Sequence, residues 1–186
     1  MVEVKVSEGV YAPAEDTFMI AKHMPRDLKG KKVLDLGCGS GMLAIVAAIN
    51  GGEVTASDIN PTALKDTIRN SEHYDVKIKT VKSDLFEKIK DKYDLIVFNP
   101  PYVPSDEHDI YISPSLRKAL VSGKRGTDIM KKFLKEFTSH LNKGGKVLLI
   151  VSSLNKIKDD LERKGWKELD SASFFFEKLY LMEFTL

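Results

Sequence analysis

Four consecutive residues, Asn99, Pro100, Pro101 and Tyr102, bring a carboxamide, two prolines and an aromatic ring together directly after the apolar run 94–98. Proline fixes φ and lacks an N–H group, so the carbonyl of Pro100 stays outside an ordinary strand ladder and is free to accept a hydrogen bond. That carbonyl, the carboxamide oxygen of Asn99 and the ring of Tyr102 would together hold a planar NH2 group. A strand that ends in a proline turn, with the tyrosine packed beneath it, explains the same residues equally well.

Three glycines, Gly37, Gly39 and Gly41, lie between a predicted buried strand, 33–36, and a predicted apolar helix, 42–50. Glycine permits positive φ and a close approach of the backbone to a ligand, and the start of a helix offers unpaired N–H groups. The spacing differs from the Gly-x-Gly-x-x-Gly pattern of dinucleotide-binding proteins, which disfavours NAD. A tight turn that uses glycine for steric reasons alone is the alternative.

Two acids follow the next two predicted strands. Asp58 ends the strand 53–57, about 20 residues beyond the glycine turn, where nucleotide-binding α/β folds place the carboxylate that holds a ribose diol. Asp84 follows the strand 76–81 and could accept a hydrogen bond from an exocyclic amine while Leu85 covers a ring face. Taken singly, each acid also fits an ordinary surface turn.

The elements around these residues predict an α/β fold with a mostly parallel sheet. The glycine turn, Asp58, Asp84 and Asn99 each follow one of four successive strands, and the carboxyl ends of parallel strands share one ligand-binding edge. A helix from 127 to Leu141, closed by the glycines at 144–145, is predicted to precede a fifth strand. The remaining predicted elements are the helix 60–71, the strands 93–98 and 146–151, the helix 155–164, and an antiparallel strand pair at 166–172 and 174–184.

Two segments lie outside these elements. Residues 11–17 form an extended arm that enters a helix, in which Glu15, Asp16 and Thr17 are read most simply as capping residues. The long irregular segment 103–126, beside the ligand edge, is predicted to be a lid or substrate loop, because such segments are usually functional. An insertion without function is the alternative.

Length and composition place further bounds on function. The 186 residues fit one domain over 1–186, with an arm and helix at 1–30 and the substrate loop at 102–126. A net charge of +2 gives no reason to expect nucleic acid or membrane as an obligatory partner. The single cysteine, Cys38, suits a reducing compartment, and the four scattered histidines predict no metal site. Without an apolar leader or a membrane-spanning run, a soluble cytoplasmic protein is expected.

The order of elements and the sequence of the glycine turn, 33–41, resemble those of class I S-adenosylmethionine-dependent methyltransferases over nearly the whole chain. The motif at 99–102 is similar to that of enzymes that methylate amino groups, both the N6-adenine DNA enzymes and the HemK family. The segment 11–17 resembles the short archaeal and eukaryotic HemK branch, which methylates the glutamine of the Gly-Gly-Gln loop in class 1 translation termination factors. The residues 123–126 also match a glycine-containing segment of that branch.

The resemblance implies a role for each residue at the end of a strand. Asp58 would contact the ribose of the cofactor, S-adenosylmethionine, while Asp84 and Leu85 would contact its adenine. The residues that the resemblance places beside the methionine portion or in the turn around the cofactor are Thr17, Asp35, Gly37, Gly39 and Gly41, with Asp16 as a weaker candidate.

The resemblance also implies how the acceptor is held. Asn99 would touch both the cofactor and the acceptor nitrogen, and the amide NH2 would donate to the Asn99 side-chain oxygen and the Pro100 carbonyl. Pro101 would complete the substrate-binding motif, and Tyr102 would stack on the planar amide. A small zinc-binding activator protein is a known partner in this branch. Bacterial HemK enzymes dock their release factor through an N-terminal helical domain for which this chain has no room.

Two other functions fit parts of the sequence. An N6-adenine methyltransferase acting on DNA or RNA would present a similar planar NH2 group, but it would have to flip the base out of its stack. The near-neutral charge and the lack of a separate recognition domain weigh against it. A non-catalytic binding subunit of the same fold is the second alternative, which the intact glycines, Asp58, Asp84 and Asn99 disfavour.

Overall fold

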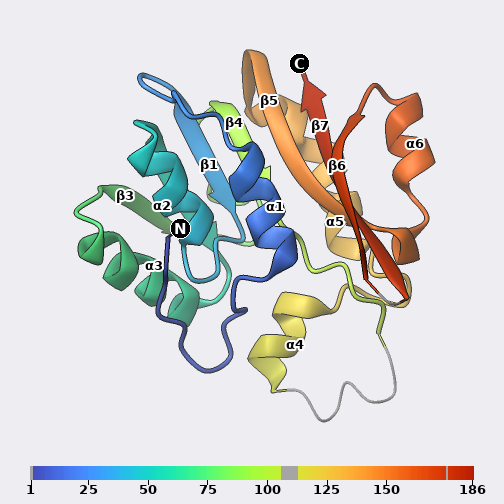
Figure 1. Ribbon diagram of the computed structural model, residues 1–186, viewed down its shortest axis with the longest axis horizontal. Helices are drawn as coiled ribbons and strands as arrows, with labels where there is room; N and C mark the ends of the chain where they lie inside the picture. Colours follow the sequence, from blue (N-terminus) through green and yellow to red (C-terminus); the bar gives the residue numbers. More distant parts are fainter. Residues whose placement is uncertain (1, 106–112, 175) are drawn as a thin grey trace.

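The computed structural model describes residues 2–105, 113–174 and 176–186 and contains one seven-stranded sheet in the order β3-β2-β1-β4-β5-β7-β6 (Figure 1). The first five strands of the chain run parallel, whereas β7 is antiparallel to both β5 and β6. The predicted fold class is therefore confirmed. The strands are β1 (Lys32–Leu36), β2 (Glu53–Asp58), β3 (Ile78–Lys82), β4 (Tyr93–Phe98), β5 (Leu141–Ser152), β6 (Lys167–Phe174) and β7 (Glu177–Thr185).

The helix Pro61–His73 begins at a recognisable start signal. The side chain of Asn60 accepts a hydrogen bond from the backbone of Thr62, and proline occupies the first turn of the same helix. The helices are α1 (Glu15–His23), α2 (Met42–Ile49), α3 (Pro61–His73), α4 (Pro114–Leu120), α5 (Asp128–Glu136) and α6 (Lys158–Arg163), with short 3-10 helices η2 (Phe137–His140) and η3 (Ser153–Asn155).

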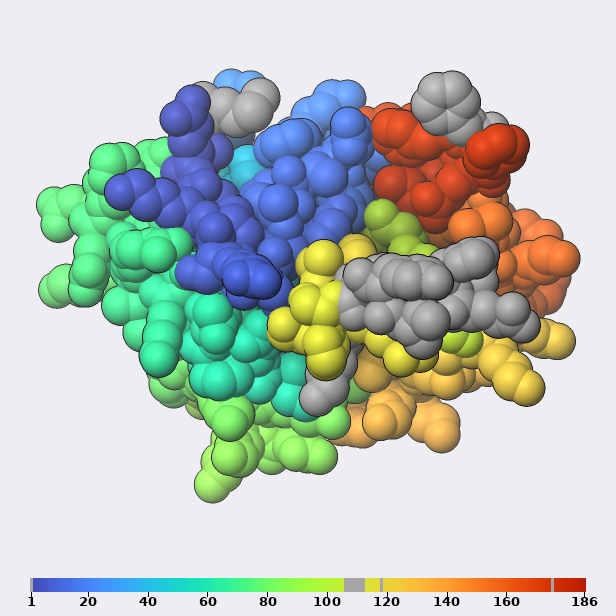
Figure 2. All heavy atoms as spheres, turned by 90° about the horizontal axis from the view of Figure 1, so that it is seen from below, coloured from blue at the N-terminus to red at the C-terminus, as the bar shows by residue number. Residues whose placement is uncertain are grey.

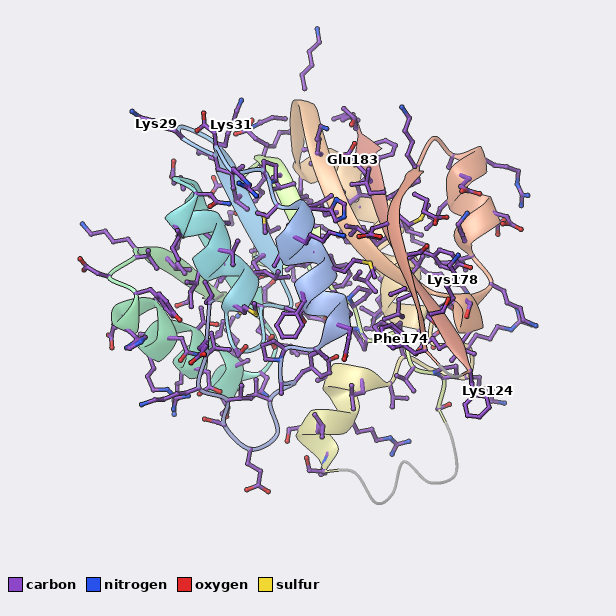
Figure 3. The ribbon with its side chains drawn as sticks, in the orientation of Figure 1. Lys29, Lys31, Lys124, Phe174, Lys178 and Glu183 are labelled. Carbon is purple, nitrogen blue, oxygen red and sulfur yellow. The ribbon has the colours of Figure 1, made fainter. Side chains whose placement is uncertain are left out.

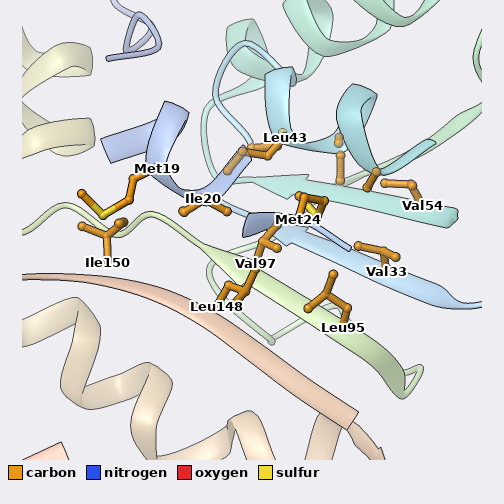
Figure 4. Packing of buried hydrophobic residues seen from close by; sticks show 14 of the residues in the cluster. Met19, Ile20, Met24, Val33, Leu43, Val54, Leu95, Val97, Leu148 and Ile150 are labelled. Carbon is orange, nitrogen blue, oxygen red and sulfur yellow. The ribbon is translucent and has the colours of Figure 1, made fainter. Parts of the chain in front are cut away.

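Each face of the sheet is covered by its own helices, because successive side chains of a strand point to opposite faces. Val33, Val97 and Leu148 pack with residues of α1 and α2 on one face (Figure 4). Leu34 and Ile96 are fully buried on the other face, among residues of α5 and η2. The strands that carry the glycine turn and Asn99 are thus fixed between two hydrophobic layers.

The segment 103–126 was predicted to be irregular, and this prediction is wrong for part of it. Residues Pro114–Leu120 form α4, whose N-cap Ser113 accepts a hydrogen bond from the backbone of Leu116. A proline in the first turn lacks only an N–H group that the helix would leave unpaired, so Pro114 starts this helix instead of breaking it. Residues 106–112 of the predicted substrate loop lie outside the described residues.

The fifth strand also begins earlier than predicted. The α-helix that was expected to reach Leu141 ends at Glu136, and η2 carries the chain from there into β5. The glycines at 144–145, predicted to end the helix, lie inside β5. A Cβ atom at Gly145 would stand 2.9 Å from the backbone oxygen of Tyr93, so the residue needs to be glycine because the neighbouring strand comes close.

The N-terminal arm lies along α3 and reaches the carboxyl edge of the sheet. The backbone N–H groups of Ser7 and Lys5 donate to the side chains of Asp66 and Asn70, at 2.7 and 3.0 Å. Seen from below in Figure 2, the arm (dark blue) and α4 (yellow) lie side by side across this edge. In the described part of the chain, no helix is both long enough and apolar enough to cross a membrane.

Candidate active site

A cavity of about 510 Å³ opens at the carboxyl ends of the parallel strands. It is lined by side chains from all four turns that the sequence singled out, including Asp35, Asp58, Asp84 and Asn99. The arm contributes Gly9 and Val10 to its wall. Its size fits a ligand of nucleoside dimensions, since binding pockets of this class enclose about 300–1,000 Å³.

The glycine turn is fixed by backbone contacts to the next strand. The N–H group of Gly39 donates to a carboxylate oxygen of Asp58 at 3.0 Å, and that of Cys38 donates to the carbonyl of Ser57. Gly41 has a φ of +84°, and a Cβ atom there would come within 2.8 Å of the Thr67 side chain. Gly41 therefore lies behind the cavity wall, where it lets α3 approach α2.

Two carboxylates, the buried Asp35 and the partly buried Asp58, face this cavity, and neither forms an ion pair with a residue that the structure describes. Asp35 is 1% exposed and accepts a hydrogen bond from the backbone of Ala44 at 2.9 Å. Burial raises the pKa of Asp35 to about 7, and the negative charge of Asp58 adds to the shift. Burial also raises the pKa of Asp58, although the backbone N–H groups of Asn60 and Gly39 oppose the shift. A cationic group bound beside Asp35 would relieve this charge burial.

The turn after β3 carries a strained residue at the cavity wall. Leu85 has a φ of +45°, a conformation that costs a non-glycine residue on the order of 1–3 kcal/mol. The hydroxyl of Ser83 holds the turn, because it donates to the carbonyl of Leu85 and accepts from the backbone of Lys88. Asp84 and Leu85 both line the cavity as a result.

Asn99 stands where two cavities meet. A second, smaller cavity of about 20 Å³ is lined by Pro100 and Tyr102, and Asn99 and Pro101 border both cavities. The side-chain nitrogen of Asn99 donates to the hydroxyl of Thr17 at 3.4 Å. Its oxygen is buried and has no hydrogen-bond partner among the described residues. Because unpaired buried acceptors are rare and costly, this oxygen is suited to receive a donor from a ligand.

Asp16 is the centre of a hydrogen-bond network that sequence reasoning underestimated. The hydroxyls of Tyr11 and Tyr102 both donate to one of its carboxylate oxygens, at 2.9 and 3.0 Å. The backbone and the hydroxyl of Thr17 donate to the other oxygen. Asp16 therefore does more than cap α1, since it connects the arm to Tyr102 and, through Thr17, to Asn99.

The two tyrosines remain hydrogen-bond donors at neutral pH. Burial is the main cause that raises the pKa of both Tyr11 and Tyr102, and the nearby charge of Asp16 raises both further. Because both hydroxyls stay protonated, each can keep donating to the Asp16 carboxylate. The ring of Tyr102 is thus held from the side of the N-terminal arm.

Asn155 also holds Tyr102 in place, and sequence reasoning missed this residue. Its side-chain nitrogen donates to the carbonyls of Tyr102, Arg125 and Gly126, at 2.8, 3.1 and 3.2 Å. A Cβ atom at Gly126 would lie 2.0 Å from the Tyr102 carbonyl, so the glycine allows these two segments to touch. The signal in the sequence was weak, because Asn155 lies far from its partners along the chain.

The predicted site residues therefore divide between two places. Pro100 and Tyr102 line the small cavity, and Gly41 lines neither. The residues found around the large cavity are Thr17, Asp35, Gly37, Gly39, Asp58, Asp84, Leu85, Asn99 and Pro101.

Comparison with known proteins shows the family to which the chain belongs. Residues 2–120 match the family model described as methyltransferase small domain. The putative protein N5-glutamine methyltransferase MJ0928 of Methanocaldococcus jannaschii is 38% identical over 163 residues, which cover 87% of this chain and 82% of that protein. The chain belongs to the methyltransferase small domain family. Within it, this methyltransferase belongs to the HemK family.

Other relatives are longer than this methyltransferase. The release factor glutamine methyltransferase of Streptococcus pneumoniae is 33% identical over 159 residues, which cover 78% of this chain and 55% of that protein. The chain thus spans about half the length of that bacterial relative. Among solved structures, the 16S rRNA N2 G1207 methyltransferase of T. thermophilus shares the fold with a TM-score of 0.70 at 22% identity, over 93% of this chain and 43% of that one.

Proposed function

We propose that this methyltransferase transfers the methyl group of S-adenosylmethionine to the side-chain amide nitrogen of a glutamine. The acceptor glutamine lies in the Gly-Gly-Gln loop of a class 1 translation termination factor. The observation that carries the proposal is the buried side-chain oxygen of Asn99, which lies between the two cavities and has no hydrogen-bond partner in the part of the chain that the structure describes. The names of the relatives in M. jannaschii and S. pneumoniae, which specify glutamine, support the same acceptor.

The large cavity fits the cofactor in size and in the chemistry of its lining. Asp35 would lie beside the positively charged amino group of the methionine portion, which would relieve the charge burial that raises its pKa. Asp58 would accept from the ribose hydroxyls, and Asp84 and Leu85 would border the adenine. When bound, S-adenosylmethionine supplies a methyl group on a sulfonium that is already activated for transfer.

The residues of the motif at 99–102 would orient the acceptor. An amide nitrogen is a poor nucleophile because its lone pair is delocalised. Its two N–H groups would donate to the side-chain oxygen of Asn99 and to the carbonyl of Pro100, which favours a pyramidal nitrogen that faces the methyl group. Such positioning can contribute on the order of 7–11 kcal/mol to lowering a barrier. No covalent intermediate with the protein is required.

Tyr102 would form the flat wall against which the amide plane rests. Its hydroxyl donates to Asp16 and its carbonyl accepts from Asn155, so the ring is held from both ends of the residue. The prolines on its N-terminal side restrict the backbone further. We expect this rigid arrangement to select a narrow, planar acceptor.

The domain organisation, the partners and the location of the enzyme are proposed on the same grounds. Residues 1–186 would act as one domain, with the arm and helix at 1–30 and a substrate loop at 102–126. The termination factor would be the protein substrate, a small zinc-binding activator would be a further partner, and the enzyme would work in the cytoplasm. Nucleic acid and membrane would not be obligatory partners.

Transfer from labelled S-adenosylmethionine tests the acceptor. The protein is incubated separately with a class 1 termination factor, with the same factor carrying alanine in place of the Gly-Gly-Gln glutamine, and with an adenine-containing duplex. We expect label on the first substrate alone, and mass spectrometry should locate it on the glutamine side chain. Label on the duplex and none on the factor would overturn the glutamine assignment in favour of adenine.

A further inference from the structure

The tip of the β6–β7 hairpin exposes an aromatic side chain without an intramolecular role. Phe176 is 95% exposed, whereas the next most exposed large hydrophobic side chain in the described part of the chain, Ile49, is 52% exposed. Fully exposed phenylalanine is unfavourable in water, and large aromatic side chains are enriched at protein interfaces. Phe176 is therefore a candidate contact for a partner.

This hairpin tip lies at the same edge of the sheet as the candidate active site. The pairing of Ser152 with Leu179 carries the hairpin beyond the carboxyl end of β5. Phe174, just before the tip, packs against the same hydrophobic cluster as Tyr102. Glu177, directly after the tip, is close enough to Tyr102 for its charge to help raise the pKa of Tyr102, although burial is the main cause of that shift.

Residues with basic side chains lie close to the hairpin tip. Asn155 in η3 binds the carbonyl of Arg125, while its neighbour Ser153 accepts from the backbone of Lys178 at the start of β7. The segment with Lys124 and Arg125 is therefore held beside the hairpin. In Figure 3, Lys124 lies next to the hairpin end, on the side of the molecule opposite Lys29 and Lys31.

These basic groups form no ion pair within the described residues. Lys124, Arg125 and Lys156 are exposed and form no ion pair with any residue that the structure describes. Leu154 in η3, two residues before Lys156, is 44% exposed. We call Phe176, Leu154, Lys124, Arg125 and Lys156 the hairpin-tip surface.

We propose that the hairpin-tip surface docks the substrate protein, through an apolar pocket flanked by acidic side chains on that protein. The inference rests on the proposed function, because an acceptor side chain that reaches Asn99 brings its own protein across this edge. Phe176 would enter the apolar pocket, and the basic side chains would pair with the surrounding acids. Contacts of this kind, a central aromatic with charged groups around it, dominate many protein interfaces.

The composition of the surface favours protein over nucleic acid. Binding of single-stranded nucleic acid uses several stacking aromatic rings along a basic groove, whereas this surface has one exposed ring beside an aliphatic side chain. A net charge of +2 for the whole chain also gives little long-range attraction for phosphates. Three local positive charges suffice to pair with acidic side chains on a protein.

Steady-state kinetics with two substrates test the inference. We expect Phe176→Ala to raise KM for the intact termination factor about tenfold with kcat unchanged, and Lys156→Glu to do the same. A short peptide that contains the Gly-Gly-Gln sequence is too small to reach the hairpin tip, so both variants should methylate it as the unchanged protein does. The matched control, Lys29→Glu, reverses one charge at the far side and should alter neither substrate's kinetics.

The outcomes separate failure of the inference from failure of the proposed function. If neither the factor nor the peptide is methylated by the unchanged protein, the proposed function is wrong and the inference falls with it. If both are methylated but the hairpin-tip variants keep the normal KM for the factor, only the inference is overturned. Loss of single-stranded RNA binding by these variants, with factor KM unchanged, would assign the surface to nucleic acid instead.

Discussion

The candidate site has two halves, the proposed cofactor half around Asp35 and Asp58 and the proposed acceptor half around Asn99 and Tyr102. The two halves are built from contacts of different sequence separation. In the cofactor half, Asp35 binds the backbone of a residue 9 positions away, and Asp58 binds the backbone of Gly39, 19 positions away. In the acceptor half, Tyr102 binds Asp16 across 86 positions and Asn155 across 53. The cofactor half is thus made within two successive strand–turn–helix units, whereas the acceptor half requires three distant segments to meet.

This difference indicates how the two halves can vary independently. The cofactor half depends on backbone geometry that any sheet of this topology provides at its carboxyl edge. The acceptor half depends on side chains of the arm, of the motif at 99–102 and of η3. Changes in the arm or in η3 should therefore alter the acceptor reaction while cofactor binding is retained.

The largest expected effect comes from Asn99→Ala, which should break the acceptor half and leave cofactor binding measurable. Loss of its side-chain oxygen should lower kcat by about 10²–10³-fold, the range seen when a preorganised hydrogen-bonding group is removed. The dissociation constant for S-adenosylmethionine, measured by calorimetry, should change by less than about tenfold. The control Asn142→Ala removes a carboxamide that binds Asp94 at the other end of the strands. Unchanged turnover of Asn99→Ala would contradict its proposed role.

Asp58→Ala should break the cofactor half and leave the acceptor half intact. Loss of the carboxylate should weaken S-adenosylmethionine binding about 10–100-fold, because hydrogen bonds to charged groups contribute about 1.5–3 kcal/mol. At saturating cofactor, kcat should stay within a few-fold of normal. Asp91→Ala, a change to a half-exposed acid that pairs with Lys79, is the matched control. A large fall in kcat with normal cofactor binding would show that the two halves are not separable.

The raised pKa of Asp35 predicts pH-dependent cofactor binding. A cation beside Asp35 stabilises its ionised form, so affinity for S-adenosylmethionine should rise about tenfold between pH 6 and pH 8, passing through the pKa of about 7, and level off above pH 8. Asp35→Asn keeps an acceptor for the Ala44 backbone and should remove most of this dependence. Any remaining dependence would come from Asp58, whose pKa is also raised. A pH-independent affinity in the unchanged protein would exclude a cation at Asp35.

The raised pKa of Asp35 also determines whether the free energy of unfolding rises or falls with pH. The folded protein holds the Asp35 proton more tightly than the unfolded chain, whose pKa is near 3.8. The free energy of unfolding contributed by this group is therefore complete below pH 4 and is lost as pH rises towards 7. Urea denaturation at several pH values should show a smaller loss in Asp35→Asn than in the unchanged protein.

Tyr102→Phe should have the smallest effect, and it tests how strongly Asp16 connects the arm to Tyr102. It removes one hydrogen bond to a carboxylate that keeps those from Tyr11 and Thr17, so the free energy of unfolding should fall by about 1–2 kcal/mol. We expect kcat to fall only a few-fold, because the ring remains in place. Tyr180→Phe, in β7, is the control. A loss of stability no larger than that of the control would mean that the link between the arm and Tyr102 is weak.

The cofactor half could be predicted from the sequence because its signals are local. The glycine turn and Asp58 each stand directly after an apolar run, so a pattern of strands is enough to bring them to one edge. The α4 helix was missed because prolines at 104 and 114 and the polar residues around them are equally typical of a loop. The glycines at 144–145 have the sequence pattern of a helix end. The sequence does not show that a neighbouring strand comes close to them.

The supports of the acceptor half could not be predicted in the same way. Asp16 stands in the first turn of a helix, where acidic residues are common, and its two tyrosine partners become visible only in three dimensions. Asn155 lies in a short polar turn whose partners are 29, 30 and 53 positions away. Only the resemblance of the arm to the HemK family indicated that residues 11–17 mattered for the acceptor.

The most direct test of the account is a crystal structure with S-adenosylhomocysteine and a peptide that contains Gly-Gly-Gln. The account predicts that the side-chain nitrogen of the glutamine lies within about 3 Å of the Asn99 side-chain oxygen and of the Pro100 carbonyl, and faces the cofactor sulfur. A glutamine side chain bound away from Asn99, or Asn99 paired with another protein group in the complex, would contradict it.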